Sequence, residues 1–296
     1  MATLRELKGR IGSVGSSEKI TGAMKMISSA KMHKAEGILR RLTPFRDCVQ
    51  GIIGNLLSSD AAVSSPLTTA HNAVRKVTVV VLGSDDGLCG AYNVNIFKGL
   101  LDTIKALRSE CGASVKIEIV PVGKKLQKIV EKFAAGDSSL TYTPAPGVDA
   151  SSDGDAVKVF ARTLETRFAA SDIDRVELMY MHYHSAGRQR LVTDMYLPVS
   201  PDKLNATAKP SVRPYIFEPD AATIFRTVLP MFLLSQMQEA FAQNRASEQA
   251  ARVMAMQSAN DNAQKLLEQL QLEYNKLRQQ SITTELLDIV GGQRRD

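Results

Sequence analysis

Tryptophan is absent from the 296 residues of this chain, and aromatic residues make up only 5% of it. Any apolar core must therefore be built from aliphatic side chains and methionine. Hydrophobic residues account for 44% of the chain and charged residues for 23%, which is typical of globular proteins and argues against a disordered or fibrous chain. The length allows one or two domains.

Long apolar runs are missing as well. No stretch of about 18 apolar residues occurs, so we expect no membrane-spanning helix. The richest apolar patch, Val228 to Leu234, is interrupted by Pro230. The first thirty residues lack the apolar segment and small-residue cleavage site of a secretory signal. A presequence removed from an organelle protein would leave no trace here.

Cysteine is sparse, with Cys48, Cys89 and Cys111 as the three examples. The number is odd and no C-x-x-C spacing occurs. This pattern predicts a reducing compartment and argues against a disulfide framework or a zinc cluster.

The net charge of +6 is unevenly distributed. Residues 1–46 contain ten lysines and arginines against three acidic residues, whereas residues 230–290 contain five basic against seven acidic residues. The two ends of the chain are therefore complementary in charge. We expect the basic end to face an acidic partner.

The N-terminal segment, from Thr3 to about Leu57, is predicted to be one amphipathic helix. Its apolar seam is narrow, as in a coiled coil, and is made of Leu4, Leu7, Ile11, Val14, Ile20, Met24 and Ile27. Glycines cost such a helix roughly 1 kcal/mol each, but they let a partner helix approach closely. They occur here at Gly9, Gly12, Gly15 and Gly22.

A second long helix is predicted from Asp220 to about Val290. Asp220 is a suitable N-cap after Pro219, Pro230 should kink the helix, and Gly291–Gly292 should end it. Its predicted seam consists of Leu234, Met237, Phe241, Ala255, Ala259, Leu266, Leu270 and Leu277.

The length of this second helix decides the fold. Seventy helical residues span about 105 Å, whereas a compact globule of this chain length has a radius of gyration of about 19 Å. The helix must therefore extend beyond a globule and pair with the N-terminal helix. The predicted fold class is an antiparallel coiled coil of the N- and C-terminal helices (residues 1–60 and 219–296) with an inserted Rossmann-like α/β domain (residues 75–200).

Strands and helices alternate in this middle segment, which predicts a small, mostly parallel sheet with helices on its faces. The predicted strands are Val77 to Leu82, Val115 to Val122, Arg175 to Tyr183 and Arg190 to Leu197, the last one antiparallel after a turn at residues 185–187. The predicted helices are Ala91 to Arg108, Lys124 to Phe133 and Asp155 to Phe168. Loops or linkers are expected at Ala61 to Asn72, Asp137 to Asp155 and Pro198 to Pro219.

The loop Gly83 to Gly90 follows a strand and precedes a helix, where a dinucleotide fold binds its ligand. Its glycines fit neither phosphate-binding motif, and two aspartates would repel phosphate, so a structural turn is the favoured interpretation. Cys89 is expected to be a buried structural thiol rather than a nucleophile. His182 and His184 share one face of a strand but lack further metal ligands nearby.

No catalytic constellation stands out, because serine, histidine and aspartate are scattered without a nucleophile-elbow pattern. The basic N-terminal arm could bind nucleic acid or an anionic membrane, although it lacks interleaved aromatic residues. A scaffold or nucleic-acid-binding coiled coil thus stays open as an alternative. A small α/β enzyme is a third hypothesis, which rests only on the loop Gly83 to Gly90.

Four segments carry a resemblance to a known family. Residues 19–31 match the run K-I-T-x-x-M-x-M-x-x-x-A-K at Lys19, Ile20, Thr21, Met24, Met26, Ala30 and Lys31. The loop Ser84 to Asn93 resembles S-D-x-G-L-C-G, with Asp86 where the family usually has arginine. Ser247 to Ala263 and Tyr274 to Gly292 are similar to the family's most characteristic stretches. The chain thereby resembles the gamma subunits of F-type ATP synthases over its whole length.

The resemblance implies a mechanical role without an active site in this chain: a central rotor shaft that couples proton-driven rotation of a membrane ring to ATP synthesis, or the reverse. Implied partners are three alpha and three beta subunits that bind MgATP and MgADP, small delta or epsilon subunits, and the c-ring. No cofactor, metal or nucleic acid is implied for this chain. Its expected location is the matrix side of the mitochondrial inner membrane, or alternatively the cytoplasmic face of a bacterial inner membrane. The resemblance places contacts with the catalytic subunits at Met24, Arg252, Gln279, Thr283 and Glu285.

Overall fold

The computed structural model describes residues 3–58, 64–71, 73–112, 114–200, 204 and 217–292. The chain forms two compact units. The first unit combines Met1–Ser29 with Arg252–Asp296, and the second is Ala30–Ala251. Two long helices contribute to both units, and no helix among the described residues has the length and hydropathy needed to cross a membrane.

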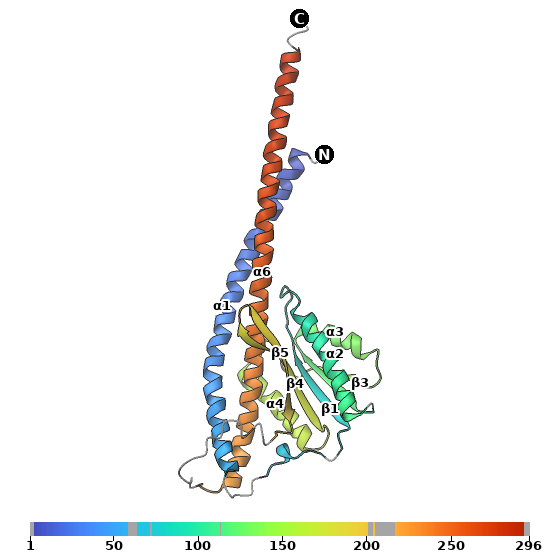
Figure 1. The fold of residues 1–296 in the computed structure, drawn as a ribbon, viewed down its shortest axis with the longest axis vertical. Coiled ribbons are helices and arrows are strands. Elements are labelled where there is room, and N and C mark those ends of the chain that lie inside the picture. The colour runs from blue at the N-terminus through green and yellow to red at the C-terminus, as the bar shows by residue number, and fades with distance from the viewer. Residues whose placement is uncertain are drawn as a thin grey trace. The chain divides into compact units, whose positions relative to one another are not determined.

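The first unit consists of the beginning of helix α1 (Leu4–Leu57) and the end of helix α6 (Ala221–Gly292). The two segments run antiparallel, so the start of α1 and the end of α6 lie toward the same end of the helix pair (Figure 1). A reciprocal capping box starts α1: the Thr3 amide donates to Glu6 at 2.8 Å, and the Glu6 amide to the Thr3 hydroxyl at 3.3 Å. The predicted antiparallel helix pair is confirmed.

The seam predicted for α1 is wrong at Ile20 and Ile27, whereas Met24 is half-buried. Ile20 and Ile27 are 59% and 57% exposed, because the inward-facing stripe keeps its regular spacing of three and four residues instead of skipping. The positions that continue this stripe carry polar residues, namely Glu18, Thr21, Lys25 and Ser28. A pattern built on hydrophobicity alone therefore followed the wrong face of the helix.

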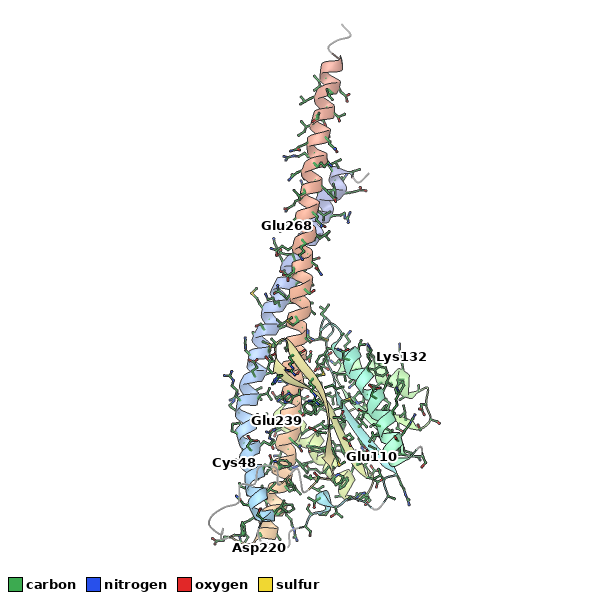
Figure 2. All side chains as sticks on the ribbon, in the orientation of Figure 1. Cys48, Glu110, Lys132, Asp220, Glu239 and Glu268 are labelled. Carbon is green, nitrogen blue, oxygen red and sulfur yellow. The ribbon has the colours of Figure 1, made fainter. Side chains whose placement is uncertain are left out.

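The seam predicted for α6 needs a smaller correction. Met237, Phe241 and Leu270 are buried as expected, but Leu266 is 40% exposed and its neighbour Leu267 faces inward instead. Gly291–Gly292 was expected to end the helix, and α6 extends to Gly292. The start is confirmed, because Asp220 (labelled in Figure 2) accepts a hydrogen bond from the Thr223 amide at 2.8 Å.

The second unit contains a five-stranded sheet in the order β3-β2-β1-β4-β5. Its strands are β1 (Lys76–Leu82), β2 (Lys116–Val122), β3 (Leu140–Tyr142), β4 (Arg175–Ser185) and β5 (Arg188–Leu197). All pairings are parallel except that of β4 with β5, which form a hairpin. The predicted Rossmann-like topology is confirmed.

Apolar clusters cover both faces of this sheet. Helices α2 (Tyr92–Cys111) and α3 (Lys124–Ala134) bury one face, through side chains such as Ile96, Leu100 and Leu126. Helix α4 (Gly154–Ala169) and the first part of α6 bury the other, through Phe160, Phe232 and Phe241. The core is aliphatic with a few phenylalanines, as the composition predicted.

Two short elements fall inside segments that were expected to be loops. Strand β3 lies within Asp137 to Asp155 and adds an edge to the sheet, and a 3₁₀ helix η1 (Pro66–Thr68) lies within Ala61 to Asn72. Three-residue elements are too short for periodicity to reveal. Most of the predicted linker Pro198 to Pro219, and part of Ala61 to Asn72, lies outside the described residues.

Candidate functional site

Small and polar residues contribute to the helix contact in the first unit, beside buried apolar residues such as Leu7 and Leu270. The side-chain amide of Asn260 on α6 donates to the carbonyl oxygen of Glu18 at 2.8 Å and lies 3.4 Å from the Thr21 hydroxyl. A Cβ atom added to Gly22 would lie 3.4 Å from the Asn260 amide nitrogen, and one added to Gly15 would lie 3.8 Å from Leu267. The close approach expected at the α1 glycines is thus limited to ordinary van der Waals contact at these two positions.

The other two glycines of this stretch behave differently. A Cβ atom at Gly9 or Gly12 would meet nothing within 4 Å. Packing inside this chain therefore does not require glycine at either position, and the predicted role in close approach is wrong there.

Beyond Leu270, the last part of α6 has no buried residue between Gln271 and Ile289. Several large apolar side chains are nevertheless exposed along it: Leu272 (70%), Ile282 (49%), Leu286 (57%), Leu287 (66%) and Ile289 (63%). A group of exposed apolar side chains on a polar helix marks a surface for a partner. α1 carries further exposed apolar residues, of which Met26 is 69% exposed.

The five contact residues implied by the family resemblance occupy different environments. Gln279, Thr283 and Glu285 are exposed on α6, and the Thr283 hydroxyl donates to the Gln279 carbonyl at 2.9 Å. Met24 is half-buried on α1. Arg252 is only 6% exposed. Their role as contacts stays a prediction.

A buried hydrogen-bond network joins α6 to the sheet of the second unit. Asn244 of α6 is 2% exposed, donates through its side chain to the Gly83 carbonyl at 2.9 Å, and accepts from the Tyr92 hydroxyl at 2.7 Å. Ser247 donates to the Met181 carbonyl at 2.9 Å. These side chains satisfy backbone groups where β1 and β4 meet the helix, and so fix this part of α6 on the domain.

Charged and phenolic groups link α1 to the same domain. Arg46 lies 2.5 Å from Glu239 of α6, which is labelled in Figure 2. The Tyr183 hydroxyl donates to Glu36, and this bond, with a second one from His33, lowers the pKa of Glu36. Burial and the same carboxylate raise the pKa of Tyr183 to about 12. Tyr183 therefore stays neutral at physiological pH and acts as a donor.

The loop Gly83 to Gly90 uses its own polar groups for structure. Asp85 accepts from the backbone amides of Lys124, at the start of α3, and of Ala150, at 3.1 and 3.0 Å. The buried Ser84 hydroxyl donates to the Asp86 carbonyl at 2.9 Å. A helix start already occupied by a carboxylate favours the structural-turn interpretation over a phosphate site.

Cys89 and the strand histidines give no support to a catalytic site. Cys89 is 3% exposed, and its sulfur lies 3.8 Å from the Ser84 hydroxyl and 3.7 Å from the Asn93 amide. His182 pairs in register with Arg190 of β5, which places a cation beside it. Over the described residues, no three histidines, cysteines or carboxylates gather as a metal site would require.

A network of charged and hydroxyl side chains lies near the β3 edge of the sheet. Glu118 of β2 is 5% exposed and accepts hydrogen bonds from Thr78, Thr143 and Arg167 at 2.8 to 2.9 Å. Burial alone would raise the pKa of Glu118, but these three donors lower it. Because the buried Glu118 carboxylate is fully hydrogen-bonded, we interpret the network as structural.

The chain thus belongs to the class of proteins in which two long terminal helices pair antiparallel and an α/β domain is inserted between them. A family model described as ATP synthase matches residues 3–294. The chain is 41% identical to the ATP synthase gamma chain of Bacteroides fragilis and 35% identical to that of Flavobacterium psychrophilum, with at least 98% of each chain covered. The chain belongs to the ATP synthase gamma-chain family.

Solved structures share the fold at low identity. A chain of the Euglena gracilis mitochondrial ATP synthase is 21% identical, with a TM-score of 0.65 over 98% of this chain and 93% of that one. A chain of the Tetrahymena thermophila central stalk and c-ring structure is also 21% identical, with a TM-score of 0.56 over 81% and 99%. The sequence relatives named above are bacterial, so the expected mitochondrial location is not supported.

Proposed function

We propose that this chain is the central rotor shaft of a bacterial F-type ATP synthase, at the cytoplasmic face of the inner membrane. It couples rotation of a proton-driven membrane ring to ATP synthesis, or ATP hydrolysis to rotation in reverse. Membership of the gamma-chain family supports the proposal. The observation that carries it is the last part of α6, which has no buried residue from Gln271 to Ile289 and exposes Leu272, Leu286 and Leu287.

The proposed partners are those that the family resemblance implies. Three alpha and three beta subunits surround the exposed apolar end of α6, small delta or epsilon subunits bind the α/β domain, and the c-ring carries the assembly. The basic stretch of α1, with the exposed Lys19 and Lys31, faces acidic segments of the beta subunits. Met24, Gln279, Thr283 and Glu285 contact the hexamer directly, whereas the nearly buried Arg252 contributes less contact area.

No catalysis is assigned to this chain. MgATP and MgADP bind on the partner subunits, and this chain holds no cofactor of its own. The purified chain should therefore hydrolyse no ATP, which a coupled-enzyme assay measures. Turnover that follows the chain through two chromatographic steps would reject this part of the proposal.

Assembly is the direct test. The chain is co-expressed with the alpha and beta subunits of the same genome, and the purified complex is weighed by native mass spectrometry. We expect one copy of this chain for three of each partner. A stable hexamer that excludes the chain, or more than one copy in each hexamer, would contradict a central shaft.

The exposed end of α6 is tested without changing its length. The variant Leu286→Ser/Leu287→Ser/Ile289→Ser should assemble but couple ATP hydrolysis to proton pumping poorly, because its apolar bearing surface is lost. Truncation after Thr284, which removes the last twelve residues, should act in the same direction. Normal pumping by both variants in inverted vesicles would remove this surface from the mechanism.

A further inference from the structure

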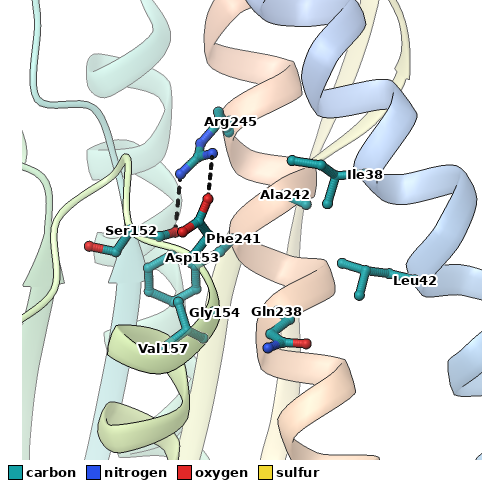
Figure 3. Close-up of a pocket in the computed structure, with 10 residues that line it drawn as sticks. All are labelled: Ile38, Leu42, Ser152, Asp153, Gly154, Val157, Gln238, Phe241, Ala242 and Arg245. Atoms are coloured by element: carbon teal, nitrogen blue, oxygen red, sulfur yellow. Dashed lines mark hydrogen bonds and ion pairs between the residues drawn. The ribbon is translucent and has the colours of Figure 1, made fainter.

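A cavity of about 250 Å³ lies between α1, α6 and the start of α4 in the second unit (Figure 3). Its walls are mainly apolar and come from all three helices: Ile38 and Leu42 of α1, Phe241 and Ala242 of α6, and Val157 of α4. A dry apolar cavity somewhat smaller than this one accommodates a benzene ring. The cavity is therefore large enough for a small apolar group.

Arg245 places a positive charge at the edge of this apolar space (Figure 3). Its guanidinium donates to the carbonyl oxygens of Ser151 and Ser152, the latter at 3.1 Å. These bonds fix the orientation of the guanidinium but do not neutralise its charge, because carbonyl groups are neutral. The cavity therefore combines an apolar interior with an oriented cation.

Asp153 supplies the nearest carboxylate. One of its oxygens lies 3.8 Å from Arg245, and the side chain is 78% exposed. It makes no capping hydrogen bond to α4, although it occupies the N-cap position. A long, solvated ion pair of this kind is weak, so another carboxylate with better geometry could replace Asp153 beside Arg245.

We propose that this cavity binds a small amphipathic carboxylate, a single aromatic or branched apolar body joined to one carboxylate by a short linker. The apolar body fills the space between Leu42, Val157 and Phe241, and the carboxylate pairs with Arg245 in place of Asp153. This site is separate from the apolar end of α6 and independent of the rotor proposal, because every residue that forms it lies within the second unit.

Binding at this position joins three helices of the unit. The occupant contacts α1, α4 and α6 together, so it stabilises the folded unit by mass action. The ligand should therefore raise the thermal unfolding midpoint of the full-length chain, and more so at higher ligand concentration.

The test uses 3-phenylpropionate as the probe, with two matched comparison compounds. 3-Phenylpropanamide has the same shape without the charge, and acetate has the charge without the apolar body. Affinities for the full-length chain are measured at pH 7 by NMR titration, which also identifies the residues whose signals move. We expect 3-phenylpropionate to bind at least tenfold more tightly than either comparison compound, with shifts at Ile38, Val157 and Phe241.

Three substitutions separate the roles of the charges. Arg245→Gln should weaken binding of 3-phenylpropionate roughly tenfold to hundredfold, since a charged hydrogen bond is lost. Arg245→Lys should retain part of the affinity. Asp153→Asn should tighten binding about threefold, because the competing carboxylate is removed while the helix cap is unchanged.

Folding of each variant is checked by its thermal midpoint without ligand, so that a misfolded variant is not taken for a non-binding one. A fourth variant, Gln238→Trp, places a bulky side chain in the cavity and should abolish binding. Equal affinity for the acid and the amide, unchanged affinity in Arg245→Gln, or shifts scattered away from the cavity would overturn the proposal. So would weaker binding in Asp153→Asn.

Discussion

The two units of this chain hold their elements together by different means. In the second unit, apolar clusters cover both faces of a sheet, and residues such as Phe160 and Leu100 are at most 1% exposed. In the first unit, only a few apolar residues such as Leu7 and Leu270 are buried, the amide of Asn260 adds a polar contact, and α6 has no buried residue from Gln271 to Ile289. The first unit therefore buries far fewer apolar side chains than the second, and single polar contacts count for more in it.

The largest expected effect is in the core of the second unit. Phe160 is 1% exposed and lies edge-on to Phe241 at 6.5 Å between ring centroids. Phe160→Ala should lower the free energy of unfolding by about 3–5 kcal/mol, because it creates a cavity. Urea denaturation measures this loss, and the exposed Val159→Ala on the same helix is the control. A loss below about 1 kcal/mol would contradict a burial-stabilised unit.

A smaller effect is expected at the polar contact of the first unit. Asn260→Ala removes the hydrogen bond to the Glu18 carbonyl and should cost about 1 kcal/mol. Hydrogen exchange at the amides of α1 near Glu18 should accelerate, while exchange in the sheet stays constant. Gln264→Ala, at an exposed position of the same helix, is the matched control. Unchanged exchange would show that the contact does not hold the helix pair.

Substitutions at the glycines of α1 should increase stability, in contrast to the two losses above. Gly12→Ala should stabilise the helix by about 0.5–1 kcal/mol, because alanine is the better helix former and its Cβ atom meets nothing within 4 Å. Gly22→Ala should gain less, since its Cβ atom would press on Asn260 at 3.4 Å. Circular dichroism melting of the two variants measures the difference. An equal gain in both would mean that Asn260 does not pack tightly there.

The last comparison is a pH dependence confined to the second unit. Burial raises the pKa of Glu165 from 4.5 to about 7. Below pH 4.5 the carboxyl is protonated in both the folded and the unfolded chain, so its contribution to stability is complete there. That contribution is lost as the pH rises through about 7, because the unfolded chain ionises more readily. Glu165→Gln should flatten this decline in urea denaturation between about pH 5 and pH 7, whereas the exposed Glu131→Gln should not.

The sheet could be predicted almost completely from the sequence, because its strands are apolar runs of ordinary length separated by clear helices. The run from Val77 to Val81, for example, is buried throughout, as a central parallel strand requires. The helix pair was predicted from length, but its inward face was not. There the contacts use Thr21, Gly22 and Ser28, which carry no hydrophobic signal, while Ile20 and Ile27 face outward.

The candidate sites were less predictable. The exposed apolar end of α6 could be located only through the resemblance, because the same leucines would suit a buried seam equally well. Asn244 carried no signal, since a single asparagine in a long helix is unremarkable in sequence yet here bonds to both Gly83 and Tyr92. The cavity beside Arg245 depends on three segments far apart in the chain, which local patterns cannot bring together.

The double role of Asp85 has a consequence for the kinetics of folding. Its carboxylate bonds to the amides of Lys124 and Ala150, which lie 39 and 65 positions further along the chain. Both bonds close long loops of the chain, so we expect them to form late in folding. Loss of this carboxylate should therefore speed unfolding and leave the folding rate nearly unchanged. We therefore expect the turn after β1 to set the unfolding rate of the domain, and with it the lifetime of the folded state.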